Sequence, residues 1–267
     1  LIYIMTNFTK RVLTSFVLLP ISAYAIFEGG WIFLFFVSSI ILVSYFELSK
    51  LIKKKNTSSY YSGFIFVALL PISAFLNIEF FINISLFLVV IYIIGIIYKK
   101  ITFIDFWSSY IFIIFYAGFG LSFAIIIRNL ETGLIFSIIP IVLSSVNDIM
   151  AYIVGKNFGQ NLAFPNVSPN KTYEGSFGGI LSTILISFLL FNLFNIDIGI
   201  YKMVFIGLII SIFGILGDFF ESLIKRKSGI KDTGNILPGH GGMLDRVDSI
   251  IFVLPIFYLI ISIIIVN

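Results

Sequence analysis

Cysteine is absent from the 267-residue sequence, and histidine occurs once, as His240. Without cysteine the chain has no disulfide, no thiolate nucleophile and no cysteine-ligated zinc or iron–sulfur centre. A single histidine also excludes a metal site built from several imidazoles. Any bound metal must therefore rely mainly on carboxylate, carbonyl, hydroxyl or substrate oxygens, which favours a hard ion such as Mg²⁺.

Charged residues are scarce as well. They make up 11% of the chain, whereas 59% is hydrophobic and the mean hydropathy is +1.11. Such a composition has too little polar surface for a soluble domain, so lipid must supply most of the surroundings. The net charge of +4 is small and its basic residues are scattered, which gives little support to a nucleic-acid partner.

Apolar runs of about 20 residues, the length that crosses a bilayer, recur along the chain. We predict an all-α, polytopic helical bundle with about nine transmembrane helices, forming one membrane-embedded domain over residues 1–267. Lys10 and Arg11 precede a first run that lacks a small-residue cleavage site, so we expect a retained span and not a removed signal peptide. The predicted cores are Val12–Phe27, Trp31–Leu48, Tyr61–Leu76, Phe80–Ile97, Phe103–Ile127, Gly133–Val154, Gly175–Phe194, Met203–Ile224 and Ser249–Val266.

The basic residues indicate an orientation. With nine spans and a cytoplasmic N-terminus, every Lys and Arg except Arg128 and Lys202 falls on the cytoplasmic side, as the positive-inside rule requires. We therefore predict an N-in, C-out protein of the cell (inner) membrane. The two longest polar connections, 156–174 and 225–248, then face the cytoplasm, so we expect the active site there. They belong to a catalytic half, 131–267, while the spans of 1–130 have no assigned role.

Acidic residues gather in the later spans, although each costs about 2.5–3.5 kcal/mol to insert and such residues usually face a cavity, a partner or a substrate. Asp218 and Glu221 are three residues apart on one helical face, Asp245 and Asp248 repeat that spacing, and Asp148 lies in the sixth span. If the last two helices pack together, a divalent cation would hold these carboxylates ionised. The alternative is simple ion pairing with Lys225, Arg226, Lys231 and Arg246.

Two polar loops contain further candidate residues. The segment 229–242, GIKDTGNILPGHGG, combines glycines, whose N–H groups can approach a phosphate, with Lys231, Asp232 and His240, but it lacks the Walker pattern. The segment 168–179, SPNKTYEGSFGG, presents hydroxyl and lysine side chains just before a span. The alternatives are tight turns in the first loop, and a helix cap followed by small packing residues in the second.

The segment 222–248, SLIKRKSGIKDTGNILPGHGGMLDRVD, resembles the signature of the phosphatidate cytidylyltransferase family. Upstream, Asn147-Asp148 and the stretch SPNKTYEG at 168–175 also resemble family elements, so the similarity covers about 147–248. The resemblance implies a nucleotidyltransferase of phospholipid biosynthesis. It would transfer CMP from CTP to phosphatidic acid, giving CDP-diacylglycerol and pyrophosphate, and would require Mg²⁺, with a second cation left open.

The same resemblance, together with charge, suggests roles for individual residues. The hypothesised metal ligands are Asp218 and Asp245, assisted by Glu221 and Asp248, with Asp148 as a further contributor. The catalytic set comprises Asp218, Asp245, Lys225, Lys231 and Arg246. The substrate and phosphate binders are Ser168, Lys171, Thr172, Arg226, Asp232, His240, Gly241 and Gly242. We also expect a lateral opening for the lipid near the inner surface, lined by phenylalanine and isoleucine.

Other classes of protein were weighed. A transporter or channel would also bear intramembrane carboxylates, but here the polar residues crowd one membrane face instead of the midplane. A related enzyme such as a polyprenol kinase would use CTP as a γ-phosphate donor. A purely structural membrane protein would not need a charged, glycine-rich loop. The expected partners are CTP, phosphatidic acid and the lipid bilayer, and a homodimer is left open.

Overall fold

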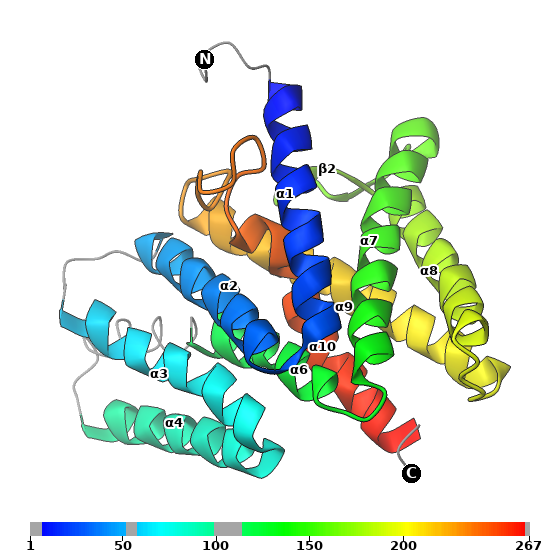
Figure 1. Cartoon of the computed structure of the whole chain (residues 1–267). Helices are drawn as coiled ribbons and strands as arrows, with labels where there is room; N and C mark the ends of the chain where they lie inside the picture. Colours follow the sequence, from blue (N-terminus) through cyan, green and yellow to red (C-terminus); the bar gives the residue numbers. More distant parts are fainter. Residues whose placement is uncertain (1–6, 52–57, 99–113, 265–267) are drawn as a thin grey trace. The chain divides into compact units, whose positions relative to one another are not determined.

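The structure is a computed structural model, described here over residues 7–51, 58–98 and 114–264 (Figure 1). Within these ranges helices dominate, with one two-stranded antiparallel sheet. The elements are α1 (Asn7–Glu28), α2 (Gly30–Leu51), α3 (Ser58–Leu76), α4 (Ile78–Tyr98), the π-helix η3 (Ile114–Phe119), α6 (Gly120–Arg128), α7 (Gly133–Phe158), β1 (Leu162–Phe164), β2 (Ser168–Thr172), α8 (Tyr173–Leu193), α9 (Ile200–Lys227) and α10 (Leu244–Ile264).

Isoleucine and phenylalanine favour strands in water, yet they form helices here. In lipid every backbone N–H and C=O must be satisfied within its own segment, and a helix does so. Six helices within the described ranges are long and apolar enough to cross a bilayer: α1, α2, α7, α8, α9 and α10. The predicted all-α membrane fold is therefore confirmed. The count of nine spans and the orientation stay predictions, and the predicted span 103–127 lies partly outside the described residues.

The chain divides into two compact units. The first contains Leu1–Glu131 and Asp232–Arg246; the second contains Thr132–Lys231 and Val247–Asn267. The predicted motif loop 225–248 therefore supplies residues to both units. The prediction of a single domain with a catalytic half at 131–267 stays a prediction.

Aromatic and aliphatic side chains form the core of the first unit. Tyr45 of α2 and Phe81 of α4 are fully buried. The Phe81 ring stacks on Phe119 at 5.2 Å between centroids and meets Phe123 edge-on at 5.4 Å. At the end of α6, Arg128 donates hydrogen bonds to the carbonyl oxygens of residues 26 and 27 at 2.6 and 2.9 Å. These carbonyls belong to the last turn of α1, where they have no helical donor.

Glycines let the helices of the second unit approach closely. A Cβ atom at Gly179 of α8 would lie 2.8 Å from the carbonyl oxygen of Asn147 in α7. At Gly207 of α9 it would lie 2.8 Å from the Cα of Ile184 in α8. Small residues at helix contacts are the common way to pack helices where lipid is as apolar as the side chains. The alternative interpretation of the segment 168–179, in which small residues serve helix packing, therefore holds at Gly179.

Candidate active site

Two carboxylates fix the loop at 232–246 in the first unit. Glu47 of α2 is 1% exposed and accepts hydrogen bonds from the backbone N–H groups of Met243 (3.0 Å) and Leu244 (2.8 Å). Asp245 accepts from the N–H groups of Gly242 (2.8 Å) and Thr233 (3.1 Å). Because these donors include the free N–H groups where α10 begins, the carboxylates neutralise the positive end of that helix.

The Thr233 hydroxyl lies between the two acids. Its Oγ1 is 3.0 Å from Asp245 Oδ2 and 3.3 Å from Glu47 Oε2, and the residue is buried. A side chain at Gly242 would have no room, since its Cβ would lie 2.1 Å from Thr233 Oγ1 and 2.7 Å from Glu47 Oε2. Gly242, predicted as a phosphate binder, is therefore required by packing, and its N–H donates to Asp245. Any role in binding phosphate stays a prediction.

Glu47 was not among the residues predicted to be functional. The signal was present, because a carboxylate near the end of an apolar run violates the composition of a span. The carboxylates of the later spans also stand in or beside the motif segments, whereas Glu47 lies far from them in the sequence. Glu47 is a positioning residue: it holds the loop that carries Asp245 and His240, and it does so from a helix almost 200 positions earlier in the sequence.

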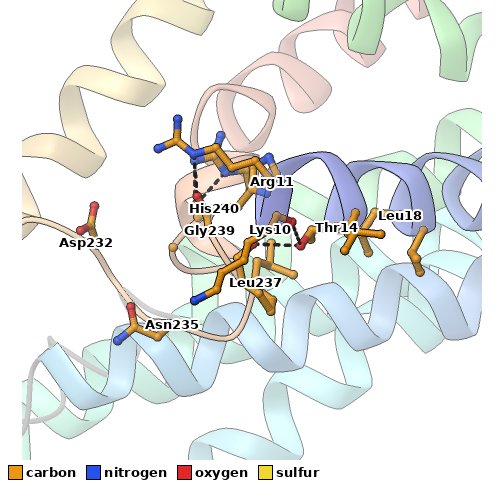
Figure 2. A pocket seen from close by; sticks show the side chains of 14 residues that line it. Lys10, Arg11, Thr14, Leu18, Asp232, Asn235, Leu237, Gly239 and His240 are labelled. Atoms are coloured by element: carbon orange, nitrogen blue, oxygen red, sulfur yellow. Dashed lines mark hydrogen bonds between the residues drawn. The ribbon is translucent and has the colours of Figure 1, made fainter. Parts of the chain in front are cut away.

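His240 sits at the tip of the same loop (Figure 2). Its Nε2 is 3.4 Å from the Ser15 hydroxyl of α1, and its carbonyl oxygen accepts from Nε and Nη2 of Arg246 at 3.1 and 2.7 Å. Burial lowers the pKa of His240 below its usual range, and the positive charges of Arg246 and Arg11 lower it further. The imidazole is therefore neutral at pH 7. Gly241 has φ of +87°, which only glycine adopts readily, so the alternative interpretation of this loop as a tight turn holds at Gly241, and phosphate binding by Gly241 stays a prediction.

In the second unit, the predicted polar connection 156–174 contains the hairpin β1–β2, which the sequence did not indicate. Glu174, which follows β2, joins the two ends of the hairpin. Its carboxylate accepts hydrogen bonds from the N–H groups of Gln160 (3.2 Å) and Asn161 (3.3 Å) and from Asn161 Nδ2 (2.8 Å). Thr172 then caps α8, its Oγ1 accepting from the Gly175 N–H at 3.1 Å. The alternative interpretation of this segment, a helix cap, therefore holds for Thr172, and phosphate binding by Thr172 stays a prediction.

Three contacts hold this hairpin against α9. The Phe164 ring lies 4.3 Å from that of Phe219, centroid to centroid. Arg226 Nε donates to the carbonyl oxygen of residue 167 at 3.0 Å. Between them the Lys171 ammonium forms an ion pair with Asp218. The anchored hairpin therefore delivers the lysine of the SPNKT segment to the first carboxylate of α9.

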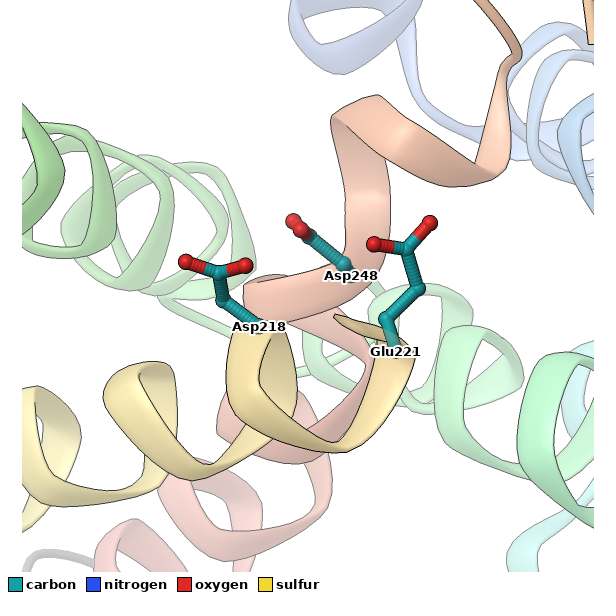
Figure 3. Close-up of side chains that lie close together, drawn as sticks. All are labelled: Asp218, Glu221 and Asp248. Carbon is teal, nitrogen blue, oxygen red and sulfur yellow. The ribbon is translucent and has the colours of Figure 1, made fainter. Parts of the chain in front are cut away.

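Asp218, Glu221 and Asp248 form a carboxylate cluster. One oxygen of each can be chosen so that all three lie within 4.8 Å of one another. Figure 3 shows them directed toward a common space, two from α9 and one from α10. Glu221 is fully buried and pairs with Lys225 one turn along. The alternative of ion pairing thus holds for Glu221 and Lys225; of the other proposed partners, Arg226 and Arg246 donate to backbone carbonyls.

The cluster depends on a close approach of α9 and α10. A Cβ atom at Gly217 would lie 2.6 Å from the carbonyl oxygen of Asp248 and 3.0 Å from the Cα of Ser249. Ser249 is buried, and its hydroxyl lies 3.4 Å from both Asp248 and Asp148. The glycine before Asp218 therefore allows carboxylates of two helices to meet.

A small cavity of about 250 Å³ adjoins this cluster. It lies within the second unit, and Asp148, Lys171, Asp218, Ser168 and Thr172 are among its lining residues. Asn147 also lines it and is 1% exposed, and its Oδ1 has no hydrogen-bond partner among the residues that the structure describes. A buried oxygen facing a polar cavity is costly unless a ligand, ion or water donates to it or binds it.

The carboxylate cluster fits a hard divalent cation. Its donors are all oxygens, and the spacing allows them to share one ion. The predicted ligands Asp218, Glu221 and Asp248 are brought together, with Asp148 lining the adjacent cavity. Asp245, Asp232, His240, Gly241 and Gly242 belong to the first unit, and Lys231 is exposed. Their catalytic roles stay predictions.

The sequence profile of the Cytidylyltransferase family matches residues 9–264 of the chain, so the chain belongs to this family. Proteins named phosphatidate cytidylyltransferase are among its relatives. Identity is 41% over 137 residues with the Staphylococcus epidermidis protein (51% of this chain, 53% of that protein) and 41% over 148 residues with that of Bacillus subtilis (55% of each). It is 39% over 163 residues with that of Aquifex aeolicus (61% and 60%). The chain spans little more than half the length of the curated relatives it matches.

Proposed function

We propose that the chain is a phosphatidate cytidylyltransferase, which transfers CMP from CTP to phosphatidic acid and releases pyrophosphate. The observation that carries the proposal is the Asp218–Glu221–Asp248 cluster, with Lys171 beside it, in a membrane-embedded member of the Cytidylyltransferase family. Carboxylates that converge on one point bind the Mg²⁺ that accompanies a nucleoside triphosphate. The relatives bearing the name phosphatidate cytidylyltransferase support the choice of substrates.

The reaction balances without a covalent protein intermediate. A phosphate oxygen of phosphatidic acid attacks the α-phosphorus of CTP, the bond from that phosphorus to the β-phosphate oxygen breaks, and pyrophosphate leaves. Mg²⁺ bound at the cluster would neutralise charge on the triphosphate oxygens. The residues that would hold it are Asp218, Glu221 and Asp248, with Asp148 close by. Asp245 stays a proposed further ligand, and its hydrogen bonds would orient it as ligating carboxylates commonly are.

The chain's own cations would stabilise the charge that develops on the leaving group. Lys171 and Lys225 each contact an acid of the cluster. With Mg²⁺ held by the cluster carboxylates, Lys171 and Lys225 would no longer be needed to neutralise them and would be able to pair with phosphate oxygens. Arg226, Lys231 and Arg246 are further proposed phosphate binders, for the triphosphate or for the lipid headgroup. Ser168 and Thr172 would donate hydrogen bonds to the same phosphates.

The proposed setting is the cytoplasmic leaflet of the cell membrane, where CTP is available. It rests on the segregation of Lys and Arg under an N-in, C-out path with nine spans. The lipid keeps its acyl chains in the bilayer and enters sideways. A homodimer and a second cation are both compatible with this reaction, and the reaction requires neither.

The test is an assay on membranes that express the chain, supplied with CTP labelled at the α-phosphate and with phosphatidic acid, with and without Mg²⁺. We expect a labelled, lipid-soluble cytidine product that requires both phosphatidic acid and Mg²⁺, released together with pyrophosphate. Empty-vector membranes are the control. With this label a CTP-dependent lipid kinase, which transfers the γ-phosphate, would release labelled CDP and form no labelled lipid, and a transporter would form neither product. Either result would overturn the proposal.

A further inference from the structure

A cavity of the first unit lies beside the opening turns of α1 (Figure 2). It measures about 850 Å³ and lies between α1 and the loop that contains His240. Two hydrogen bonds fix these walls to each other: Arg11 Nε donates to the carbonyl oxygen of Gly239 at 2.8 Å, and Thr14 Oγ1 donates to that of Pro238 at 2.9 Å. The cavity is thus a built part of the unit.

Cations dominate the charged groups that line it. Lys10, Arg11 and Arg246 contribute positive charge, and Asp232 is the one acid among the lining residues. Each guanidinium has five N–H donors. Arg11 uses one and Arg246 two in hydrogen bonds to loop carbonyls, so both are oriented and retain donors for a ligand. The ammonium of Lys10 makes no ion pair or hydrogen bond with any residue in the described ranges.

The lowered pKa of His240 supports a positive potential in this cavity. The shift arises first from burial and then from the charges of Arg246 and Arg11. A neutral imidazole adds no positive charge of its own, but it can donate or accept one hydrogen bond. The wall therefore offers an anion two oriented guanidinium groups, one ammonium group and polar side chains, which are the groups that bind phosphate in proteins.

The same cavity continues onto an apolar surface. Leu13, Val17 and Leu18 of α1 line it next to the cations. Over its membrane-spanning length only 6% of α1 is buried within the molecule, and Val17 is 54% exposed. From Lys10 to Val17 the helix rises about 10 Å, so charge gives way to apolar surface over the distance from a lipid headgroup to its acyl chains. A soluble nucleotide has no acyl chain that could lie against this apolar surface.

We propose that this cavity binds the phosphate headgroup of a phosphomonoester lipid, with Lys10, Arg11 and Arg246 contacting the phosphate and the acyl chains lying along Leu13 and Val17. The inference rests on the proposed function, which requires a phosphomonoester lipid as acceptor. It divides the basic residues between the two substrates: Arg246 serves the lipid with Lys10 and Arg11, whereas Lys171 and Lys225 serve the nucleotide.

The test compares Lys10→Ala with Lys50→Ala, and with Lys10→Arg as the conservative variant. Lys50 is a matched control because it is exposed, lies in the last turn of α2 in the same unit, and does not line the cavity. The first measurement is native mass spectrometry of the detergent-solubilised chain with dioleoyl phosphatidic acid, with dioleoyl phosphatidylcholine as reference lipid. We expect retention of phosphatidic acid to fall about 10-fold in Lys10→Ala, to recover in Lys10→Arg and to be unchanged in Lys50→Ala.

The second measurement is the KM for each substrate in mixed micelles. We expect Lys10→Ala to raise the KM for phosphatidic acid about 10-fold, expressed as mole fraction, and to leave the KM for CTP unchanged. A raised KM for CTP alone would assign the cavity to the nucleotide and overturn the inference, as would lipid retention equal to wild type. If the wild-type chain formed no CDP-lipid but lipid retention still depended on Lys10, the proposed function would fail and the lipid site would stand.

Discussion

The two units use carboxylates in opposite ways. In the first unit, Glu47 and Asp245 are surrounded by donors: both accept from backbone N–H groups, and the Thr233 hydroxyl lies within reach of each and can donate to one of them. In the second unit, Asp218, Glu221 and Asp248 face one another. Lys171 pairs with Asp218 and Lys225 pairs with Glu221. Both sets would look alike in a count of acids. Their surroundings distinguish carboxylates that protein donors already neutralise from carboxylates whose mutual repulsion calls for a cation.

The physical difference between the two sets is the number of hydrogen-bond donors around each carboxylate. A carboxylate that accepts several N–H bonds keeps its charge without help, because the donors replace its hydration. Carboxylates within about 5 Å of one another repel. Lysine side chains are flexible and neutralise them less well than a divalent cation bound between them would. Substitution of Glu47 should therefore lower folding stability, whereas substitution in the second set should weaken the response to Mg²⁺.

The largest effect should come from removing a charge from the second set. Asp218→Asn keeps the shape of the side chain but loses the charge nearest Lys171, so turnover should fall about 10³-fold, the scale for losing a group that stabilises transition-state charge. The measurement is CDP-lipid formation from labelled CTP over a Mg²⁺ titration. Asp197→Asn, an exposed acid in the connection before α9, is the control and should be normal. Near-normal turnover in Asp218→Asn would remove the cluster from the mechanism.

Geometry can be tested without touching a charge. Gly217→Ala places a Cβ 2.6 Å from the carbonyl oxygen of Asp248, and backbone cannot move aside as a side chain can. The two helices must separate, so the carboxylates lose their spacing. We expect turnover to fall about 100-fold and the protein to lose about 2 kcal/mol of stability.

Gly214→Ala is the matched control for this variant, one turn earlier on the same helix. Its Cβ would meet its nearest neighbour at 3.5 Å, an ordinary contact. Turnover and melting temperature in detergent should stay close to wild type. Equal effects at the two glycines would mean that α9 tolerates or resists alanine generally, and that the approach to α10 is unimportant.

Long apolar runs made the helices predictable from sequence, because lipid leaves the backbone few alternatives. The hairpin was not predictable in the same way. Its strands, three and five residues long, include the polar run Ser168–Thr172, too short for an alternating pattern to emerge. What holds the hairpin is tertiary: the Phe164–Phe219 contact and the bond from Arg226 to the chain at residue 167.

The site was predictable in part for a similar reason. Spacing of three residues placed Asp218 and Glu221 on one face, and packing of α9 on α10 added Asp248. The division of the motif 222–248 between the two units could not be predicted from the sequence, because residues that are adjacent in the chain can pack in different units. Glu47 was overlooked because its partners stand far along the chain and are mostly backbone groups.

Glu47→Gln should separate stability from metal binding. An amide NH₂ would replace one of the two oxygens that accept N–H bonds, leaving a buried donor facing donors. We expect a loss of about 2–3 kcal/mol, seen as a fall of about 5 °C or more in melting temperature. The rise in melting temperature on adding Mg²⁺ should persist, because the cluster is intact.

Glu28→Gln, at an exposed acid of α1, should change neither quantity. The division between the two carboxylate sets would break down if Glu47→Gln abolished the Mg²⁺ response while the melting temperature without Mg²⁺ stayed at the wild-type value.

The smallest expected effect concerns His240, the titrating group of the first unit's loop. Its pKa in the folded protein lies below the usual value of about 6.5. As pH falls through 6.5 the unfolded chain takes up a proton before the folded one, so protonation of the imidazole begins to lower the free energy of unfolding. This loss of stability grows until the pH passes the folded pKa and is constant below it. His240→Gln removes this loss while keeping a polar side chain. Between pH 7.5 and 5.5 the melting temperature of wild type should therefore fall further than that of the variant, by less than about 3 °C. Parallel curves would mean that the cations around His240 do not act on its imidazole, and the positive potential inferred for the lipid cavity would lose that support.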